Sequence, residues 1–156
     1  MPDTLQKPIK EFMTKKVMTV GEDESIKNVF KIMDKHGILG VPVVNDDQKV
    51  IGMITESDLI EHFTTLETPK SIALLGSILY LDDLSEFNKN LKEHCSETVK
   101  DLMNKEVITI DEEASLLDAI NLMSEKDVNR LPVLNNDETL AGIVTRTDMV
   151  HQLAKL

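Results

Sequence analysis

The hydrophobic and polar pattern of this 156-residue chain occurs twice, with the second copy 90 residues after the first. The stretch Val17–Ser25 (VMTVGEDES) returns as Val107–Ser115 (VITIDEEAS), and residues 9–63 align without a gap on residues 99–153. A repeat of fixed period indicates a supersecondary unit that cannot bury its apolar face alone. We therefore expect two similar motifs that fold together as one module.

Each copy shows the same order of elements. The β-branched runs at 17–20 and 107–110 predict a first strand, and apolar residues at i, i+3, i+4 and i+7 from Ile26 and Leu116 predict an amphipathic helix. Ser115-x-x-Asp118 is a capping box ahead of the second of these helices, and Ser25-x-x-Asn28 is a weaker version. The other predicted elements are a short leading helix, two strands of a hairpin and a last helix: 9–13, 41–44, 50–54 and 57–63 in the first copy, and 99–103, 131–134, 140–144 and 147–154 in the second.

The predicted fold class is α/β (α+β), built from two β-α-β-β-α motifs related by a pseudo-two-fold axis. We expect motif 1 at residues 9–63, a helical linker or insert at 64–98, and motif 2 at 99–156. Thr68-Pro69 and the apolar run Ile72–Leu81 predict a helix in the insert. This helix is either a linker packed on the core or a surface for a dimer or another partner.

Charge and composition exclude several classes of function. The chain has 17 basic and 28 acidic residues, so its formal charge of −11 argues against nucleic acid or anionic membranes as partners. Its start lacks the apolar segment of a signal peptide, and the longest apolar run is shorter than the ~20 residues of a membrane span. We expect a soluble, cytoplasmic protein.

Cysteine and histidine give no sign of a reactive or metal site. Cys95 is the only cysteine, and the four histidines (His36, His62, His94 and His151) lack the spacing of metal ligands. We therefore expect neither catalytic residues nor a metal bound by the protein, although a divalent cation bridging to a bound nucleotide stays open. With no activated nucleophile or acid–base pair, an enzyme is the least favoured class.

The segments Gly52–Asp58 (GMITESD) and Gly142–Asp148 (GIVTRTD) carry the candidate chemistry. In each, a strand leads a threonine, and three residues later an aspartate, into the first turn of a helix. Thr-x-x-Asp is a capping box on the simplest interpretation. The alternative is a nucleoside-phosphate site, because a helix N-terminus attracts phosphate and a carboxylate can accept both ribose hydroxyls.

Together these segments resemble a tandem pair of CBS (cystathionine-β-synthase-type) domains, known as a Bateman module. The resemblance rests on the opening runs at 13–20 and 103–110, the strands around Pro42 and Pro132, the Asn/Asp turns, and Gly-x-x-Thr-x-x-Asp in both copies. It implies two sheets packed together with helices outside, and two clefts. It also implies adenosyl ligands such as AMP, ADP, ATP or S-adenosylmethionine, and no true cofactor.

Carried over to this sequence, the resemblance implies ribose contacts for Asp58 and Asp148 and hydroxyl contacts for Thr55 and Thr145. Adenine would lie between the start of the first strand and the residues around the proline. These positions are Val17, Met18, Thr19, Ile38, Val41 and Pro42 in the first copy, and Val107, Ile108, Thr109, Val128, Leu131 and Pro132 in the second.

The two copies differ in charge at two positions. Arg130 aligns with Gly40, and Arg146 aligns with Glu56. Since phosphate favours a basic site, we expect the charged end of a ligand to prefer the second copy. The alternative is that both arginines pair with surface carboxylates such as Asp127.

The preferred prediction is a non-enzymatic regulatory module that forms a homodimer and signals to an effector protein in trans. The alternative is a ligand-free scaffold or dimerisation protein in which Thr-x-x-Asp only caps helices.

Overall fold

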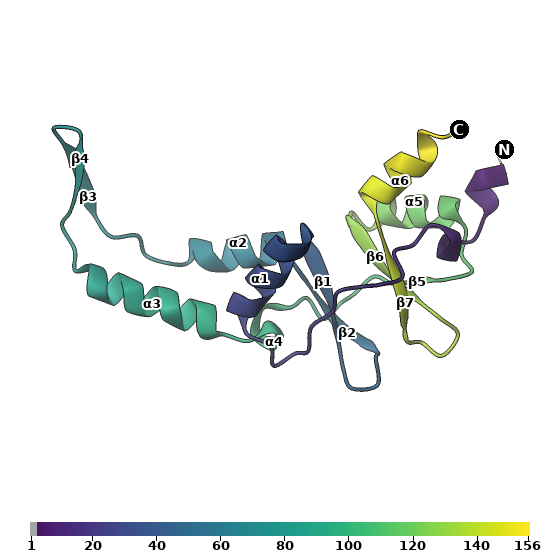
Figure 1. The fold of residues 1–156 in the computed structure, drawn as a ribbon, viewed down its shortest axis with the longest axis horizontal. Coiled ribbons are helices and arrows are strands. Elements are labelled where there is room, and N and C mark those ends of the chain that lie inside the picture. The colour runs from purple at the N-terminus through teal and green to yellow at the C-terminus, as the bar shows by residue number, and fades with distance from the viewer. Residues whose placement is uncertain (1–2) are drawn as a thin grey trace. The chain divides into compact units, whose positions relative to one another are not determined.

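The computed structural model describes residues 3–156 as a mixed α/β fold of short helices and small sheets (Figure 1). Both copies contain the amphipathic helix, the hairpin and the last helix that the sequence predicts. The elements are η1 (Asp3–Gln6), η2 (Ile9–Glu11), α1 (Ile26–His36), β1 (Gly40–Val44), β2 (Val50–Thr55), α2 (Glu56–Thr64), β3 (Ser71–Leu74), β4 (Ser77–Tyr80), α3 (Leu84–Ser96), α4 (Val99–Leu102), β5 (Ile110–Asp111), α5 (Leu116–Glu125), β6 (Arg130–Leu134), β7 (Leu140–Thr145) and α6 (Arg146–Leu153).

The chain divides into two compact units that do not follow the boundary between the two copies. One unit contains the segment up to Thr19 together with Pro42–Met53 and Asn104–Leu156, and the other contains Val20–Val41 and Ile54–Met103. Each copy therefore contributes to the first unit, since Pro42–Met53 comes from the first hairpin.

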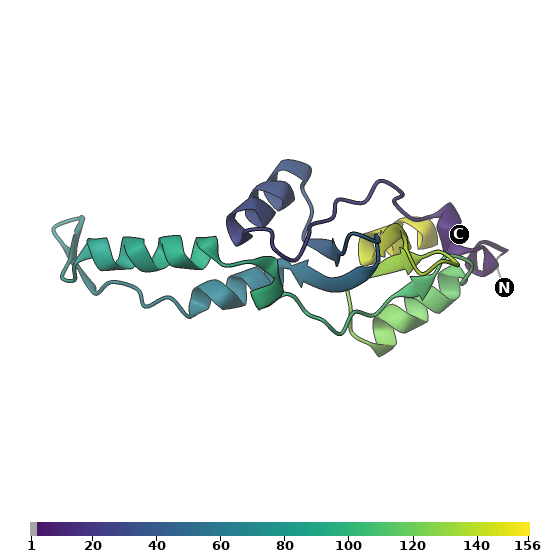
Figure 2. The same cartoon turned by 90° about the horizontal axis from the view of Figure 1, so that it is seen from below.

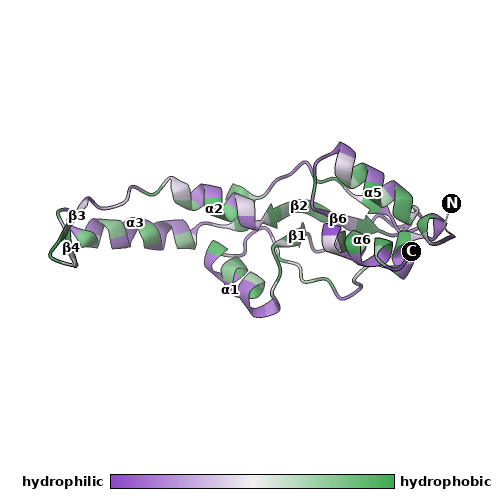
Figure 3. Cartoon of the chain, turned by 90° about the horizontal axis from the view of Figure 1, so that it is seen from above, coloured by the Kyte–Doolittle hydropathy of each residue, from purple (hydrophilic) through white to green (hydrophobic). Residues whose placement is uncertain are grey.

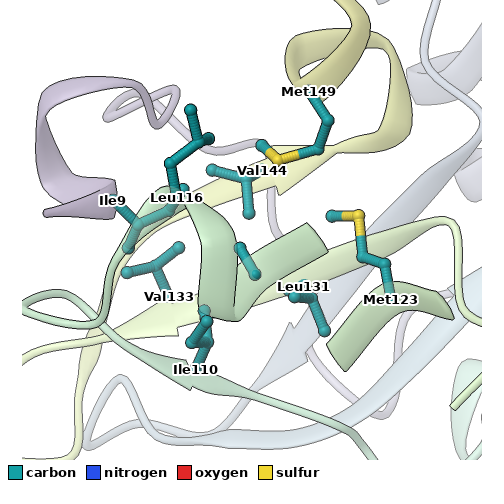
Figure 4. Packing of buried hydrophobic residues seen from close by; sticks show 9 residues of the cluster. Ile9, Ile110, Leu116, Met123, Leu131, Val133, Val144 and Met149 are labelled. Atoms are coloured by element: carbon teal, nitrogen blue, oxygen red, sulfur yellow. The ribbon is translucent and has the colours of Figure 1, made fainter. Parts of the chain in front are cut away.

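The first unit is built on a three-stranded sheet of order β5-β6-β7. β5 runs parallel to β6, and β6 runs antiparallel to β7. Its core gathers apolar side chains from the sheet, from α5 and α6, and from the N-terminal segment, as Figure 4 shows. The fully or nearly fully buried members are Ile9, Ile110, Leu116, Ala119, Met123, Leu131, Val133, Val144 and Met149.

The helix starts follow the capping chemistry of the sequence. Ser25 Oγ accepts a hydrogen bond from the Asn28 amide at 3.2 Å, and Ser115 Oγ accepts one from the Asp118 amide at 3.1 Å. The Asp118 carboxylate in turn accepts from the Ser115 amide at 2.9 Å, which completes the predicted capping box. These bonds satisfy amides that a helix start otherwise leaves without partners.

The predicted first strands at 17–20 and 107–110 are wrong in extent. Residues 17–19 form no strand and Val20 makes only a single bridge, while β5 begins at Ile110. β-Branched residues favour extended backbone, but a strand also needs a neighbour to complete its hydrogen-bond ladder. The first hairpin accordingly forms a two-stranded sheet of β1 and β2.

The predicted helix over Ile72–Leu81 is also wrong, because this segment folds as the antiparallel hairpin β3–β4. Leu75 and Gly76 form its tip with φ values of 48° and 80°, which match the left-handed conformations of a tight hairpin turn. Every residue of both strands is exposed, so the apolar run covers no core in this chain. Figure 3 shows hydrophobic residues along the hairpin.

The acidic stretch that follows the hairpin forms α3, which begins at the Asp83 cap. Figures 1 and 2 place the hairpin at the end of α3 that is farther from α4. Among the described helices, none combines the length and the hydropathy that crossing a bilayer requires.

Candidate functional site

Thr145 and Asp148 form a tight pair where β7 passes into α6. Asp148 Oδ2 accepts hydrogen bonds from the Thr145 amide and from Thr145 Oγ1, each at 2.8 Å. The Asp148 amide donates to Thr145 Oγ1 at 3.3 Å. Both side chains are half-buried, so the helix start fixes a carboxylate and a hydroxyl close to the surface.

Thr55 and Asp58 repeat this geometry where β2 passes into α2. Asp58 Oδ2 accepts from the Thr55 amide and from Thr55 Oγ1, again at 2.8 Å each. The two Thr-x-x-Asp segments are therefore capping boxes, as the simpler interpretation predicts.

A capping role does not exhaust the hydrogen-bonding capacity of these aspartates. In each box the two bonds from the threonine end on Oδ2, and an ionised carboxylate has a second acceptor oxygen with its own lone pairs. The same group can thus hold the helix start through Oδ2 and accept a hydroxyl of a ligand through Oδ1.

Hydrogen bonds and strand register bring the two arginines of the second copy to the same end of the sheet. Arg130, the first residue of β6, pairs with Thr145, the last residue of β7. The Arg146 amide donates to Asn129 O at 2.9 Å, and Arg146 Nε donates to Val128 O at 3.2 Å. Arg130, Thr145, Arg146 and Val128 therefore lie around one sheet end.

Arg146 also contacts Asp127, the pairing that the alternative predicts for this arginine. Its guanidinium lies 3.2 Å from Asp127 Oδ1, and the two side chains are 50% and 95% exposed. An ion pair this exposed contributes little stability and is screened by salt. A bound anion could therefore compete for the guanidinium at small cost.

The remaining candidates of the second copy belong to the same unit. In the parallel ladder Ile110 pairs with Val133, which puts Thr109 near the level of Pro132, the middle residue of β6. Val107, Ile108, Thr109 and Val128 are half-buried, whereas Leu131 is fully buried in the core. Adenine contacts by these residues stay a prediction. All ten candidates of this copy lie in the first unit: Val107, Ile108, Thr109, Val128, Arg130, Leu131, Pro132, Thr145, Arg146 and Asp148.

The candidates of the first copy are divided between the units. Thr55, Asp58, Ile38 and Val41 belong to the second unit, where the Glu56 amide donates to Leu39 O at 3.1 Å as its counterpart Arg146 does to Asn129. The others belong to the first unit: Val17, Met18, Thr19 and Pro42. Val41 and Pro42 are buried, and Met18 is 36% exposed.

Gly142 allows a close approach of backbone, but the approaching segment comes from the chain itself. Thr14 and Ile143 form a bridge with N···O distances of 2.9 and 3.0 Å. A Cβ on Gly142 would lie 3.0 Å from Thr14 O and 2.7 Å from Met13 Cγ. The close approach of residues 13–14 therefore explains a glycine at this position without a ligand.

Sequence reasoning missed one cluster of chemically active side chains. His62 and His94 are 32 positions apart in the sequence, yet their rings lie 4.6 Å apart in the second unit, next to Glu97. No local spacing indicates this cluster, because His62 lies in α2, His94 lies in α3 and Glu97 follows α3, and only the tertiary fold brings the two helices together.

Comparison with protein families gives the description "CBS domain" for two segments, residues 9–64 and 99–155. An uncharacterised protein of Methanocaldococcus jannaschii, MJ1426, is 32% identical over 152 residues, which cover 93% of this chain and 90% of that protein. The inosine-5'-monophosphate dehydrogenase of the same organism is 28% identical, but the match covers 91% of this chain and only 23% of the enzyme.

Two of the solved structures that resemble this chain are complexes with small molecules. CBSX2 in complex with AMP has a TM-score of 0.71 and 23% identity, covering 96% of this chain and 97% of that one. The CBS domain pair of MJ0100, in complex with 5'-methylthioadenosine and S-adenosyl-L-methionine, has a TM-score of 0.68 and 23% identity, covering 95% and 96%. At this identity the two structures support the shared fold.

Proposed function

This chain belongs to the CBS-domain family as a tandem pair, and on that premise we propose that it is a regulatory module that binds an adenosine-containing ligand. The observation that carries the proposal is the pair Thr145 and Asp148, where a helix start holds a carboxylate with its second oxygen available beside a hydroxyl and an arginine. Adenosyl ligands in the complexes of CBSX2 and MJ0100 support the choice of ligand class.

In the proposed complex Asp148 Oδ1 accepts a ribose hydroxyl while Oδ2 keeps the helix cap. Arg130 and Arg146 face the phosphate or another charged end, and Thr145 contributes its hydroxyl. Val107, Ile108, Thr109, Val128, Leu131 and Pro132 contact adenine. Asp58 and Thr55 offer the same handle in the first copy, with Ile38 and Val41 of the same unit against the base.

The two copies differ in the charge that a ligand would meet. Glu56 occupies the position of Arg146, so a phosphate near the first copy would meet a carboxylate instead of a guanidinium. Repulsion in a partly desolvated site weakens the binding of an anion. We therefore assign the more anionic ligand to the second copy.

The wider role in this proposal is regulation without catalysis. A ligand that binds two arrangements of the module with different affinity shifts their populations, which is what a switch requires. Signalling to an effector protein in trans, a homodimer and a cytoplasmic location complete the proposal. The exposed apolar hairpin β3–β4 supports a partner surface, since apolar patches of this kind mark interaction sites.

A second candidate function is a scaffold in which the Thr-x-x-Asp segments only cap helices. The capping geometry of both copies favours it directly. The two candidates differ in one respect, namely whether an adenosyl compound stabilises the fold.

Thermal denaturation with AMP, ADP, ATP, S-adenosylmethionine and cyclic dinucleotides distinguishes them. A ligand at 100 times its Kd adds about 2.7 kcal/mol to the free energy of unfolding, which raises Tm by roughly 5–10 °C in a domain of this size. Arg146→Glu, which copies the first repeat, should weaken ATP more than S-adenosylmethionine. A flat response to every compound at millimolar concentration would leave the scaffold as the better account.

A further inference from the structure

We propose that His62, His94 and Glu97 form a binding site for a zinc ion between the ends of α2 and α3. One donor atom from each of these residues lies within 4.8 Å of the donors from the other two. All three residues belong to the second unit and are half-buried. They stand apart from the Thr-x-x-Asp pairs, so the inference does not depend on the proposed adenosyl ligand.

His62 presents a buried nitrogen toward the cluster. The side chain is 14% exposed, and Nε2 is shielded from solvent without a hydrogen-bond partner among residues 3–156. A buried polar atom without such a bond loses its hydration and gains nothing in return. Glu97 Oε2 lies 3.4 Å from this nitrogen, so either a proton on His62 or a cation between the two groups would offset the charge of the carboxylate.

The orientation of the His94 ring leaves Nε2 as the nitrogen whose lone pair can bind a metal ion. Its Nδ1 lies 3.0 Å from Asn90 O, and a carbonyl can only accept, so Nδ1 carries the proton. In a neutral imidazole Nε2 then holds the lone pair. A metal-binding histidine usually fixes its tautomer in this way, by donating the other N–H to a carbonyl or carboxylate.

The nearest hydroxyl does not fully satisfy that lone pair. Thr65 Oγ1 lies 2.7 Å from His62 O and 3.2 Å from His94 Nε2. The hydroxyl has one proton, and the shorter bond places it on the carbonyl. His94 Nε2, His62 Nε2 and Glu97 Oε2 thus form a group of electron-pair donors that a cation would bridge.

The His62–Glu97 separation and the types of the three residues fit zinc. A tetrahedral site with Zn–N and Zn–O bonds of about 2.0–2.2 Å keeps neighbouring donors about 3.4 Å apart. The His62–Glu97 pair already has this separation at 3.4 Å. Two imidazoles and one carboxylate are a common zinc set, which leaves a fourth position for water.

The surrounding fold holds the three residues in place. Phe63 packs edge-on against Phe30 with ring centroids 5.3 Å apart, which anchors the end of α2. Glu97 O accepts a hydrogen bond from the Ile26 amide at 2.9 Å, which fixes the backbone that follows α3. Zinc would therefore join two segments whose backbones are already positioned, and the insert would be tied to the motif that precedes it.

The test uses the full chain without a polyhistidine tag and measures Zn²⁺ binding by calorimetry. Co²⁺ serves as a spectroscopic substitute, because four-coordinate cobalt absorbs visible light. We expect one Zn²⁺ per chain with a Kd of about 1 µM or tighter. His62→Asn, His94→Gln and Glu97→Gln should each weaken binding at least tenfold, and the first two should abolish the cobalt absorption.

Matched controls keep the result interpretable. His151→Asn removes a histidine from the other unit, and Cys95→Ser removes the thiol beside His94, so both should bind as the unchanged protein does. Far-UV circular dichroism of each metal-free variant separates loss of a ligand from loss of the fold. Failure to bind one Zn²⁺ per chain, or binding that survives His62→Asn and His94→Gln in folded protein, would overturn the site. Neither outcome bears on the adenosyl ligand.

Discussion

Replacing Asp148 by alanine separates the capping role of this residue from its proposed role in binding ribose. The substitution removes the carboxylate that accepts from the Thr145 amide and Thr145 Oγ1 at 2.8 Å. Loss of a helix cap costs about 1 kcal/mol, which corresponds to a fall in Tm of roughly 2–4 °C. This loss is expected whether or not the protein binds a ligand.

The structure supplies a matched control in Asp118. This residue has the same capping geometry at the start of α5, accepting from the Ser115 amide at 2.9 Å and from Ser115 Oγ at 2.7 Å. Asp118 is not among the candidate ligand residues. Asp118→Ala should therefore lower Tm by a similar amount and leave any response to nucleotides unchanged.

The ligand effect is larger than the capping effect. A hydrogen bond to a charged group contributes about 1.5–3 kcal/mol, and each 1.4 kcal/mol is a factor of ten in Kd. Asp148→Ala should therefore weaken the tightest adenosyl ligand at least tenfold. At a ligand concentration that raises Tm of the unchanged protein by several degrees, most of that rise should disappear.

Thermal denaturation and calorimetry of the two variants measure both effects. Equal binding of the ligand by Asp148→Ala and Asp118→Ala would contradict a ribose contact by Asp148. An unchanged Tm of Asp148→Ala without ligand would contradict its capping role, because the cap would then contribute nothing.

Three further predictions concern the fold. Hydrogen bonds from the Ser115 hydroxyl and amide lower the pKa of Asp118 from its usual 3.8. The contribution of this carboxylate to stability is therefore complete above pH 3.8 and is lost as pH falls through the lower pKa of the folded state. Asp118→Asn should reduce the dependence of Tm on pH in this acid range, and an unchanged acid transition would contradict the stabilising role of the Asp118 carboxylate. Leu116→Ala in the core should cost about 2–5 kcal/mol in urea denaturation, whereas Leu75→Asn, at a position that is 99% exposed with a φ of 48°, should cost nothing measurable. Gly142→Ala should cost roughly 1–3 kcal/mol because its Cβ would overlap Met13 Sδ and lie 2.7 Å from Met13 Cγ and 3.0 Å from Thr14 O. Gly21→Ala, with no atom within 4 Å of the added Cβ, tests whether the loss comes from crowding.

The sequence predicted the elements whose signals are local. Apolar residues at helical spacing and the caps at Ser25 and Ser115 located α1 and α5. The Asn/Asp turns located the hairpins β1–β2 and β6–β7. The Thr-x-x-Asp segments were correctly placed at the starts of α2 and α6. The family assignment also came from the sequence, because a motif repeated at a fixed offset is specific.

Predictions failed where a neighbour decides the structure. Val17 and Thr19 are β-branched and favour extended backbone, yet residues 17–19 form no strand. A strand forms only where a neighbouring segment completes its hydrogen-bond ladder. The run Ile72–Leu81 is apolar enough for a buried helix, yet it folds as a hairpin around Leu75 and Gly76. A short apolar run carries no periodicity that separates the two structures.

The amino-acid sequence by itself determined the repeat, the helix starts, the charge difference between the copies and the family of this protein, because each follows from residue identities along the chain and needs no knowledge of the packing. The tertiary structure alone decided that Arg130 lies opposite Thr145, that Arg146 contacts Asp127, and that His62 meets His94 and Glu97. Such contacts join residues far apart in the sequence. They form only when the packing of apolar faces fixes which segments become neighbours.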